Sequence, residues 1–172
     1  NTATGGDATI VNKTAVNLAT SVVGRDLNVT ATTGVITDSG TINVANNGRF
    51  ETATANETIS LDQLNVVGTV ELSTSGTAGD AAIVNTTQVN LAASNVGGDL
   101  TVAATTGGIV DSGIISVVGN SRFDSLESGA DIVLDQLNVI GTISVMTVGL
   151  CGDVTLVNTT GIDFADSVID GA

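Results

Sequence analysis

Proline, tryptophan, tyrosine and histidine are absent from the 172 residues of this sequence, and it holds a single cysteine, Cys151. One cysteine cannot form an internal disulfide framework, so a disulfide-stabilised fold is excluded. Cys151 stands where Ala78 stands 73 positions earlier, and we expect a small, partly buried side chain there, with a cross-link between chains as the alternative. No apolar run is long enough to cross a bilayer, so no membrane insertion is predicted.

Basic residues are also scarce. Lys13, Arg25, Arg49 and Arg122 stand against 18 acidic residues, which gives a formal net charge of −14. This charge repels phosphate backbones and anionic lipid surfaces, so nucleic-acid binding is not expected. It favours solubility and association with cations.

The residues that are plentiful are those of strands and turns, with 21 glycines beside many threonines, valines, asparagines and serines. Apolar and polar residues alternate in short runs, as in Leu27/Val29, Ile42/Val44 and Leu64/Val66. A period of two predicts strands with one buried face. The fold class is therefore predicted to be all-β.

An internal repeat organises the chain. The hexapeptide Leu-Asp-Gln-Leu-Asn-Val at residues 61–66 returns at residues 134–139, 73 positions later. A regular period of this kind is typical of repeat architectures. We divide the chain, as one segment covering 1–172, into repeats 7–79, 80–152 and a shortened 153–172. Because the sequence starts and stops inside its own repeat, we expect it to be part of a much longer protein.

The repeat contains a shorter period that predicts a β-solenoid. Strands begin near Ala8, Leu27, Ile42, Ile59 and Ala81, in steps of about 19, 15, 17 and 22 residues. Coils of this size cannot bury their apolar residues alone, so they are expected to stack about 4.8 Å apart, with about four coils in each repeat. Asparagines in the middle of the apolar triplets, such as Asn43 and Asn65, should face solvent and form amide ladders.

Three motifs carry a family resemblance: Gly-Asp-Leu-x-Val at residues 98–102, Thr-Gly-x-Ile-x-Asp-Ser-Gly at 33–40 and Ile-x-Leu-Asp-x-Leu-Asn at 59–65. In these motifs the chain resembles the filamentous hemagglutinin-like repeat exoproteins and adhesins of bacteria. The resemblance implies a right-handed parallel β-helix that forms the shaft of a fibre outside the cell or at the bacterial cell surface.

Acidic residues at the starts of coils are candidates for a metal site. Stacked coils would place the carboxylates of Asp7 and Asp26, and those of Asp80 and Asp99, about 5 Å apart, within reach of a shared calcium ion. The alternative is turn chemistry, in which the same side chains accept local backbone hydrogen bonds. The sequence lacks the Gly-Gly-x-Gly-x-Asp spacing of calcium-binding β-rolls.

No catalytic or cofactor-binding residue is predicted, because histidine is absent and the acidic residues recur with the repeat, whereas an active site normally interrupts a repeat once. The remaining candidates are structural. Asp62-Gln63 and Asp135-Gln136 are expected at solvent-side corners, and Phe50, Phe123 and Phe164 are expected to fill the core. Asn-x-Thr triplets that permit glycosylation begin at Asn12, Asn28, Asn56, Asn85 and Asn158.

The sequence thus predicts a structural, non-enzymatic protein: the shaft of an extracellular bacterial filament or filamentous adhesin, or a matrix component. Two alternatives stay open, a solenoid face that binds carbohydrate or a receptor, and a subunit that assembles head to tail. The expected partners are further repeats of the same chain or identical subunits along the axis, and the surface of a host or neighbouring cell.

Overall fold

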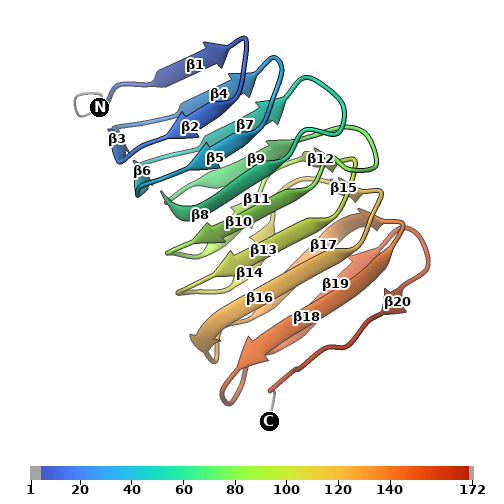
Figure 1. Ribbon diagram of the computed structural model, residues 1–172. Helices are drawn as coiled ribbons and strands as arrows, with labels where there is room; N and C mark the ends of the chain where they lie inside the picture. Colours follow the sequence, from blue (N-terminus) through green and yellow to red (C-terminus); the bar gives the residue numbers. More distant parts are fainter. Residues whose placement is uncertain (1–4, 171–172) are drawn as a thin grey trace.

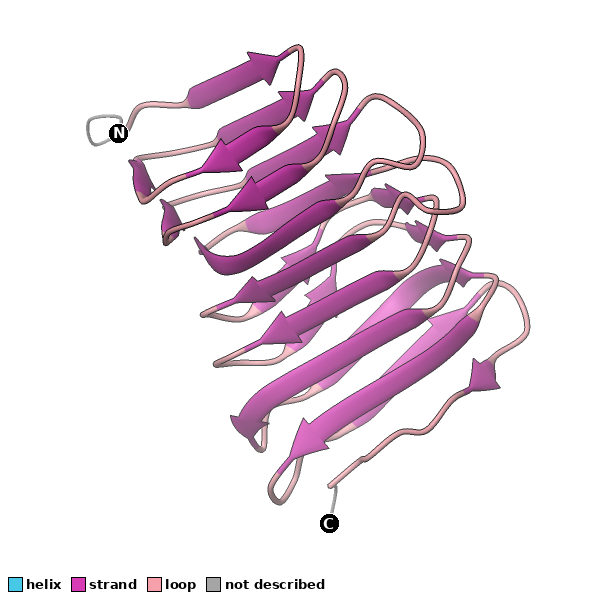
Figure 2. Ribbon diagram, viewed as in Figure 1, coloured by secondary structure: helices cyan, strands magenta, loops and turns pink. Residues whose placement is uncertain are grey.

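The computed structural model describes residues 5–170, which form strands and loops with no helix (Figures 1 and 2). None of these residues therefore forms a helix that would reach across a bilayer. Within the described range the strands form two sheets of ten, called here sheet A and sheet B.

Sheet A contains β1 (Ala8–Asn12), β4 (Leu27–Ala31), β7 (Gly48–Thr52), β9 (Thr69–Ser73), β11 (Val89–Leu91), β12 (Ser94–Val96), β14 (Ile109–Asp111), β15 (Ile115–Val117), β17 (Ile132–Val139) and β19 (Val154–Asn158). Sheet B contains β2 (Val16–Leu18), β3 (Ser21–Val23), β5 (Ile36–Asp38), β6 (Ile42–Val44), β8 (Ile59–Val66), β10 (Ala81–Asn85), β13 (Leu100–Ala104), β16 (Ser121–Ser128), β18 (Thr142–Val148) and β20 (Asp163–Phe164).

The pairings between these strands are parallel, and the chain winds through both sheets to make a β-solenoid of about seven turns. In Figure 1 the turns follow one another from β1 at one end to β20 at the other. Ala8 pairs with Leu27, Leu27 pairs with Gly48, and Gly48 in turn pairs with Val70. Hydrogen bonds that join these successive turns link residues 19, 21 and 22 positions apart, so the turns differ slightly in length.

The core lies between the two sheets and runs the length of the solenoid. Alternate residues of each strand point inward, as in β4, where Leu27, Val29 and Ala31 are buried. Phe50 and Phe123 are fully buried, as the sequence predicts. The ring of Phe50 lies so close to Gly48 that a Cβ at that glycine would be only 3.0 Å from it. The missing side chain of Gly48 therefore makes room for the ring.

Phe164, expected in the core with the other two phenylalanines, is instead 49% exposed. It lies in β20, which pairs with β18 on one side. No later strand within residues 5–170 pairs with β20 on the other side, so the inward face of this last described turn stays open.

The second repeat enters the solenoid on the opposite sheet from the first. β1 lies in sheet A, but its equivalent in the second repeat, β10, lies in sheet B. The same exchange holds for β2 and β11, for β8 and β17, and for β9 and β18. The sequence predicts about four coils per repeat; the structure fixes the number at three and a half, because two repeats make about seven turns.

The different coil count has a local cause. Ile42, which the sequence pattern marks as the start of a new coil, pairs with Ser21 and Leu64 and continues the turn that began at Leu27. Two short strands with a bend between them, β5 and β6, thus occupy one half of a turn. Strand periodicity does not distinguish such a bend from a corner that carries the chain to the other sheet.

Candidate functional site

The coil-start aspartates form a hydrogen-bonded ladder at the corners of the solenoid. The Asp7 carboxylate accepts a hydrogen bond of 3.2 Å from the backbone N–H of Asp26, one turn later. At the equivalent position of the second repeat, Asp80 accepts one of 2.9 Å from the N–H of Asp99. These bonds join successive turns, so the carboxylates perform the turn chemistry that was the alternative to metal binding.

The four calcium candidates, Asp7, Asp26, Asp80 and Asp99, lie as two pairs on successive turns, and each pair is joined by one backbone-to-carboxylate hydrogen bond. Among residues 5–170, however, no three acidic, histidine or cysteine side chains are grouped so that they would hold a metal ion. One oxygen of each candidate accepts a backbone N–H: Asp26 accepts from Asn47 at 3.1 Å, and Asp99 accepts from Asn120 at 2.7 Å. Calcium binding stays a prediction.

The repeated Asp-Gln dipeptide is held by an aspartate from the preceding turn. Asp62 and Gln63 are consecutive exposed residues inside β8, between the buried Leu61 and Leu64. One carboxylate oxygen of Asp38 accepts the N–H of Asp62 at 3.1 Å, and the other accepts the N–H of Gln63 at 2.9 Å. The two N–H groups point at the same carboxylate, so Asp38 fixes the bend that lets β8 bury residues on both sides of the dipeptide.

The second repeat builds the same clamp on the other sheet. Asp111 accepts the N–H groups of Asp135 and Gln136, also at 3.1 and 2.9 Å. The predicted solvent-side position of the dipeptide is confirmed at both places, since all four side chains are exposed. The role of Asp38 and Asp111 was not predicted, although the recurring Asp-Ser-Gly was visible in the sequence.

A buried asparagine continues the β-ladder where a strand ends. The side-chain oxygen of Asn85 accepts the N–H of Val66 at 2.8 Å, and its Nδ2 donates to the carbonyl of Val66 at 3.0 Å. An amide side chain thus offers the same donor and acceptor as a peptide group. Asn158 repeats this arrangement with Val139, at 2.8 and 3.0 Å.

This role changes the interpretation of the Asn-x-Thr triplets. Asn85 is fully buried, so its amide is inaccessible for glycosylation in the folded chain. The threonine two residues later also contributes to the ladder, because the Thr87 hydroxyl donates to the carbonyl of Val66 at 3.1 Å. The amide ladder expected between Asn43 and Asn65 is confirmed, with a hydrogen bond of 2.8 Å.

Arg49 lies on the outer face of sheet A between two carboxylates. Its Nε donates to Glu71 at 2.8 Å and its NH1 group lies 2.9 Å from Glu51. The hydrogen bond that Arg49 donates to Glu71, followed by its bond to Glu51 and the charge of Glu51, raises the pKa of Arg49 above its ordinary value, although partial burial acts in the other direction. Beside this group is a polar hollow of about 240 Å³ lined by Arg49, Glu71, Asn28, Asn47, Asp26, Gly48 and Thr69.

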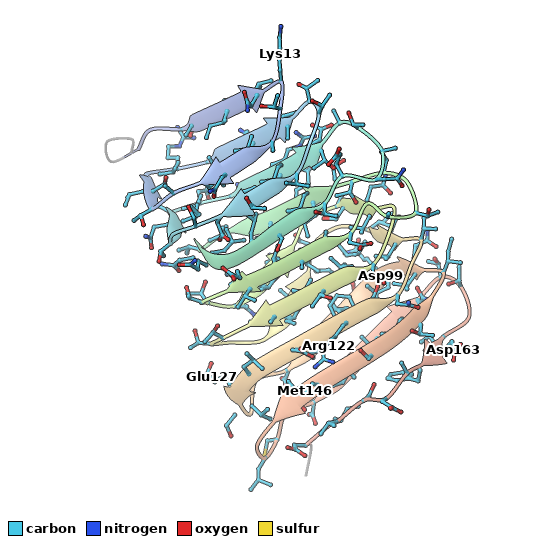
Figure 3. The ribbon with its side chains drawn as sticks, viewed as in Figure 1. Lys13, Asp99, Arg122, Glu127, Met146 and Asp163 are labelled. Carbon is cyan, nitrogen blue, oxygen red and sulfur yellow. The ribbon has the colours of Figure 1, made fainter. Side chains whose placement is uncertain are left out.

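Arg122, the equivalent of Arg49, has a simpler environment on sheet B. Its Nε bonds Asp124 at 2.8 Å, and Ser144 and Met146 occupy the places of Glu71 and Ser73 in the next turn. Figure 3 shows Arg122 on β16 and Met146 on the neighbouring β18. The second oxygen of Asp124 is buried without a hydrogen-bond partner among residues 5–170.

Cys151 is exposed, contrary to the expected partial burial. It lies in the loop after β18 with a φ of 71°, next to the exposed Leu150. The equivalent Ala78, in the loop between β9 and β10, is exposed as well, so this position faces solvent in both repeats.

The stacked parallel strands, the internal repeat and the uninterrupted core define a β-solenoid repeat protein. Two segments of the chain, residues 5–76 and 78–147, match the family model described as repeats of unknown function (DUF5649), and the chain belongs to this family. The second match thus begins one repeat after the first. Comparison with curated proteins finds no match, and neither does comparison with solved structures.

Proposed function

We propose that this chain is a structural shaft segment of an extracellular bacterial filament or filamentous adhesin, where it supplies length, rigidity and attachment to a cell surface or matrix. Likeness of its motifs to filamentous hemagglutinin-like exoproteins supports the proposed setting. The proposed role needs neither catalysis nor a cofactor.

The continuity of the solenoid across the junction between repeats is the observation that carries this proposal. β8 of the first repeat pairs with β10 of the second, and β9 pairs with both β11 and β12. The inward residues on both sides of the junction, such as Leu72 and Ile83, are at most 1% exposed. Repeats joined in this way extend one body instead of forming separate domains.

Backbone hydrogen bonds along the axis supply the rigidity. Each turn bonds the next through parallel ladders, and the aspartate and asparagine side chains described above add bonds between turns. Bending the rod would stretch these bonds and open the close-packed core. The charge of −14 keeps such rods apart in solution.

A binding face for carbohydrate or a receptor is the second candidate function. It is favoured by the hollow beside Arg49, where carboxylate, amide and guanidinium groups lie together on the outer face of sheet A. Such groups offer donors and acceptors that suit hydroxyl-rich ligands. A glycan array compared between the chain and its Arg49→Ala variant would test this candidate.

Rod length as a function of repeat number tests the shaft. Chains with one, two and four added repeats should appear in negative-stain images as rods that lengthen by about 17 Å per repeat, from three and a half turns of about 4.8 Å. Compact particles whose length does not follow repeat number would contradict the shaft. Protease treatment of intact producing cells, followed by immunoblotting, tests the extracellular location, since an internal protein would survive.

A further inference from the structure

The first turn of the solenoid carries a third copy of the asparagine that completes a ladder. Asn12 is equivalent to Asn85 and Asn158, and its Nδ2 donates to the Thr14 hydroxyl at 3.1 Å and to the Ala15 carbonyl at 2.9 Å. Asn85 makes the same two bonds one repeat later, to Thr87 and Gln88, at 3.1 Å each. The amide of Asn12 is thus already oriented like the amide of Asn85, which binds the neighbouring strand at Val66.

The strand around Asn12 and its copy in the second repeat differ strongly in how far they are covered by a neighbouring strand. Ile10 is 37% exposed on β1, whereas the equivalent Ile83 on β10 is 1% exposed because β8 lies beside it. Asn12 is exposed, whereas Asn85 is fully buried against Val66. At the end shown in blue in Figure 1, Lys13 projects from the turn that follows β1 (Figure 3). Among residues 5–170, β1 therefore presents a formed edge with an open apolar side.

We propose that the β1 edge is a docking surface for the last turn of another repeat of this family, and that Asn12 binds the backbone of a Leu-Asn-Val strand in that turn. The partner is defined by chemistry seen twice within the chain. A strand that ends in Leu-Asn-Val offers the valine N–H to the asparagine oxygen and the valine carbonyl to its Nδ2.

A second copy of this chain is a poor source for that strand. Its two Leu-Asn-Val segments, 64–66 and 137–139, are already bonded by its own Asn85 and Asn158. The partner must therefore be a repeat whose final strand is not yet covered. This inference rests on the proposed shaft function and deepens it, since it identifies the residue that selects what stacks on the shaft.

An extension of the chain tests the inference. A second copy of residues 132–152, carrying Cys151→Ala, is placed directly before Asp7 in exchange for residues 1–6. The added valine equivalent to Val139 then precedes Asn12 by 19 positions, the separation found between Val139 and Asn158 and between Val66 and Asn85. Asn12→Ala is made in the extended and in the original chain. Asn17→Ala, on the same turn at an exposed position of β2, is the matched control.

In the original chain, Asn12→Ala should shift the melting temperature by no more than about 2 °C. In the extended chain, the same substitution should lower the melting temperature by about 4–8 °C, which corresponds to a loss of about 2 kcal/mol in a chain of this size. The amide of the added valine should be protected from hydrogen exchange in the extended chain and lose protection in its Asn12→Ala variant. Asn17→Ala should have the same small effect in both chains.

Two results would overturn the inference. Equal losses from Asn12→Ala in both chains would show that the amide serves only its own turn. Concentration-dependent association of the original chain, abolished by Asn12→Ala in sedimentation experiments, would identify a second copy as the occupant. If either result were found while rods still lengthened with repeat number, the docking proposal would fail and the shaft proposal would stand. Compact particles would instead contradict the shaft proposal, without testing the docking edge.

Discussion

Two pairs of equivalent residues in the two repeats behave in opposite ways. Asp38 and Asp111 make the same two bonds, with the same lengths, although one lies in sheet B and the other in sheet A. Arg49 holds two carboxylates on sheet A, whereas Arg122 holds one on sheet B. In these two pairs, the side chain that bonds the backbone of the next turn makes the same contacts in both repeats, whereas the side chain that pairs on the outer face does not.

Removal of a core phenylalanine should have the largest effect. Phe50→Ala or Phe123→Ala leaves a cavity in a fully buried site and should lower the free energy of unfolding by about 3–5 kcal/mol in urea titrations. The two losses should be similar, since both rings occupy equivalent inward sites. Phe164→Ala is the control; a loss as large as that at Phe50 would show that Phe164 is covered in solution.

Asn85→Ala should have the next largest effect. It leaves the buried N–H of Val66 without its partner and leaves the Val66 carbonyl with the Thr87 hydroxyl as its side-chain donor. The Asn85 amide also loses its own bonds to Thr87 and Gln88, and the whole change should cost about 2–4 kcal/mol. Chemical denaturation measures this loss. Asn28→Ala, on the outer face of β4, is the matched control and should cost little; equal losses would mean that the buried amide adds nothing to the ladder.

Loss of either aspartate clamp should cost less, and the same amount in both repeats. Asp38→Ala and Asp111→Ala each remove two backbone hydrogen bonds to a carboxylate and should each cost about 1.5–3 kcal/mol. Amide exchange at Gln63 and Gln136 should rise selectively. Clearly unequal losses would break the comparison, because they would show that the two sheets do not provide equivalent environments.

Changes at the arginines should have the smallest effect and should differ between the repeats. Arg49→Gln leaves two neighbouring carboxylates without their cation, whereas Arg122→Gln leaves one. Both arginines are substantially exposed, so each loss should stay below about 1 kcal/mol and shrink at high salt. Thermal unfolding at two salt concentrations measures the difference; a larger loss at Arg122 would contradict it.

The sequence predicts the fold well because the period-two alternation and the internal repeat can both be recognised from the order of residues along the chain. Ile59, Leu61, Leu64 and Val66 are buried as the pattern predicts, and Asp62-Gln63 faces outward. The sheet exchange between repeats was not predictable, because alternation fixes which side of a strand is buried and not which sheet the strand joins. That choice depends on whether a bend, such as residues 39–41, keeps the chain in the same sheet.

The sites were less predictable for a related reason. The partners of Asp38 lie 24 and 25 residues away, and the partner of Asn85 lies 19 residues away, so each bond depends on the length of a particular turn. Those lengths are not constant, since the bonds between the first turns span 19, 21 and 22 positions. Local motifs such as Asp-Ser-Gly and Asn-x-Thr therefore mark the positions without identifying their partners.

The half-integral number of turns per repeat gives the rod two equivalent sides. Any group borne once per repeat emerges on alternating sides at intervals of about 17 Å, and on one chosen side at intervals of about 34 Å. An antibody or receptor that recognises such a group would therefore find a regularly spaced lattice of sites whichever way the rod is rotated. Groups borne once per repeat are therefore presented on both sheets in turn, and neighbours that recognise them can bind on both sides at once.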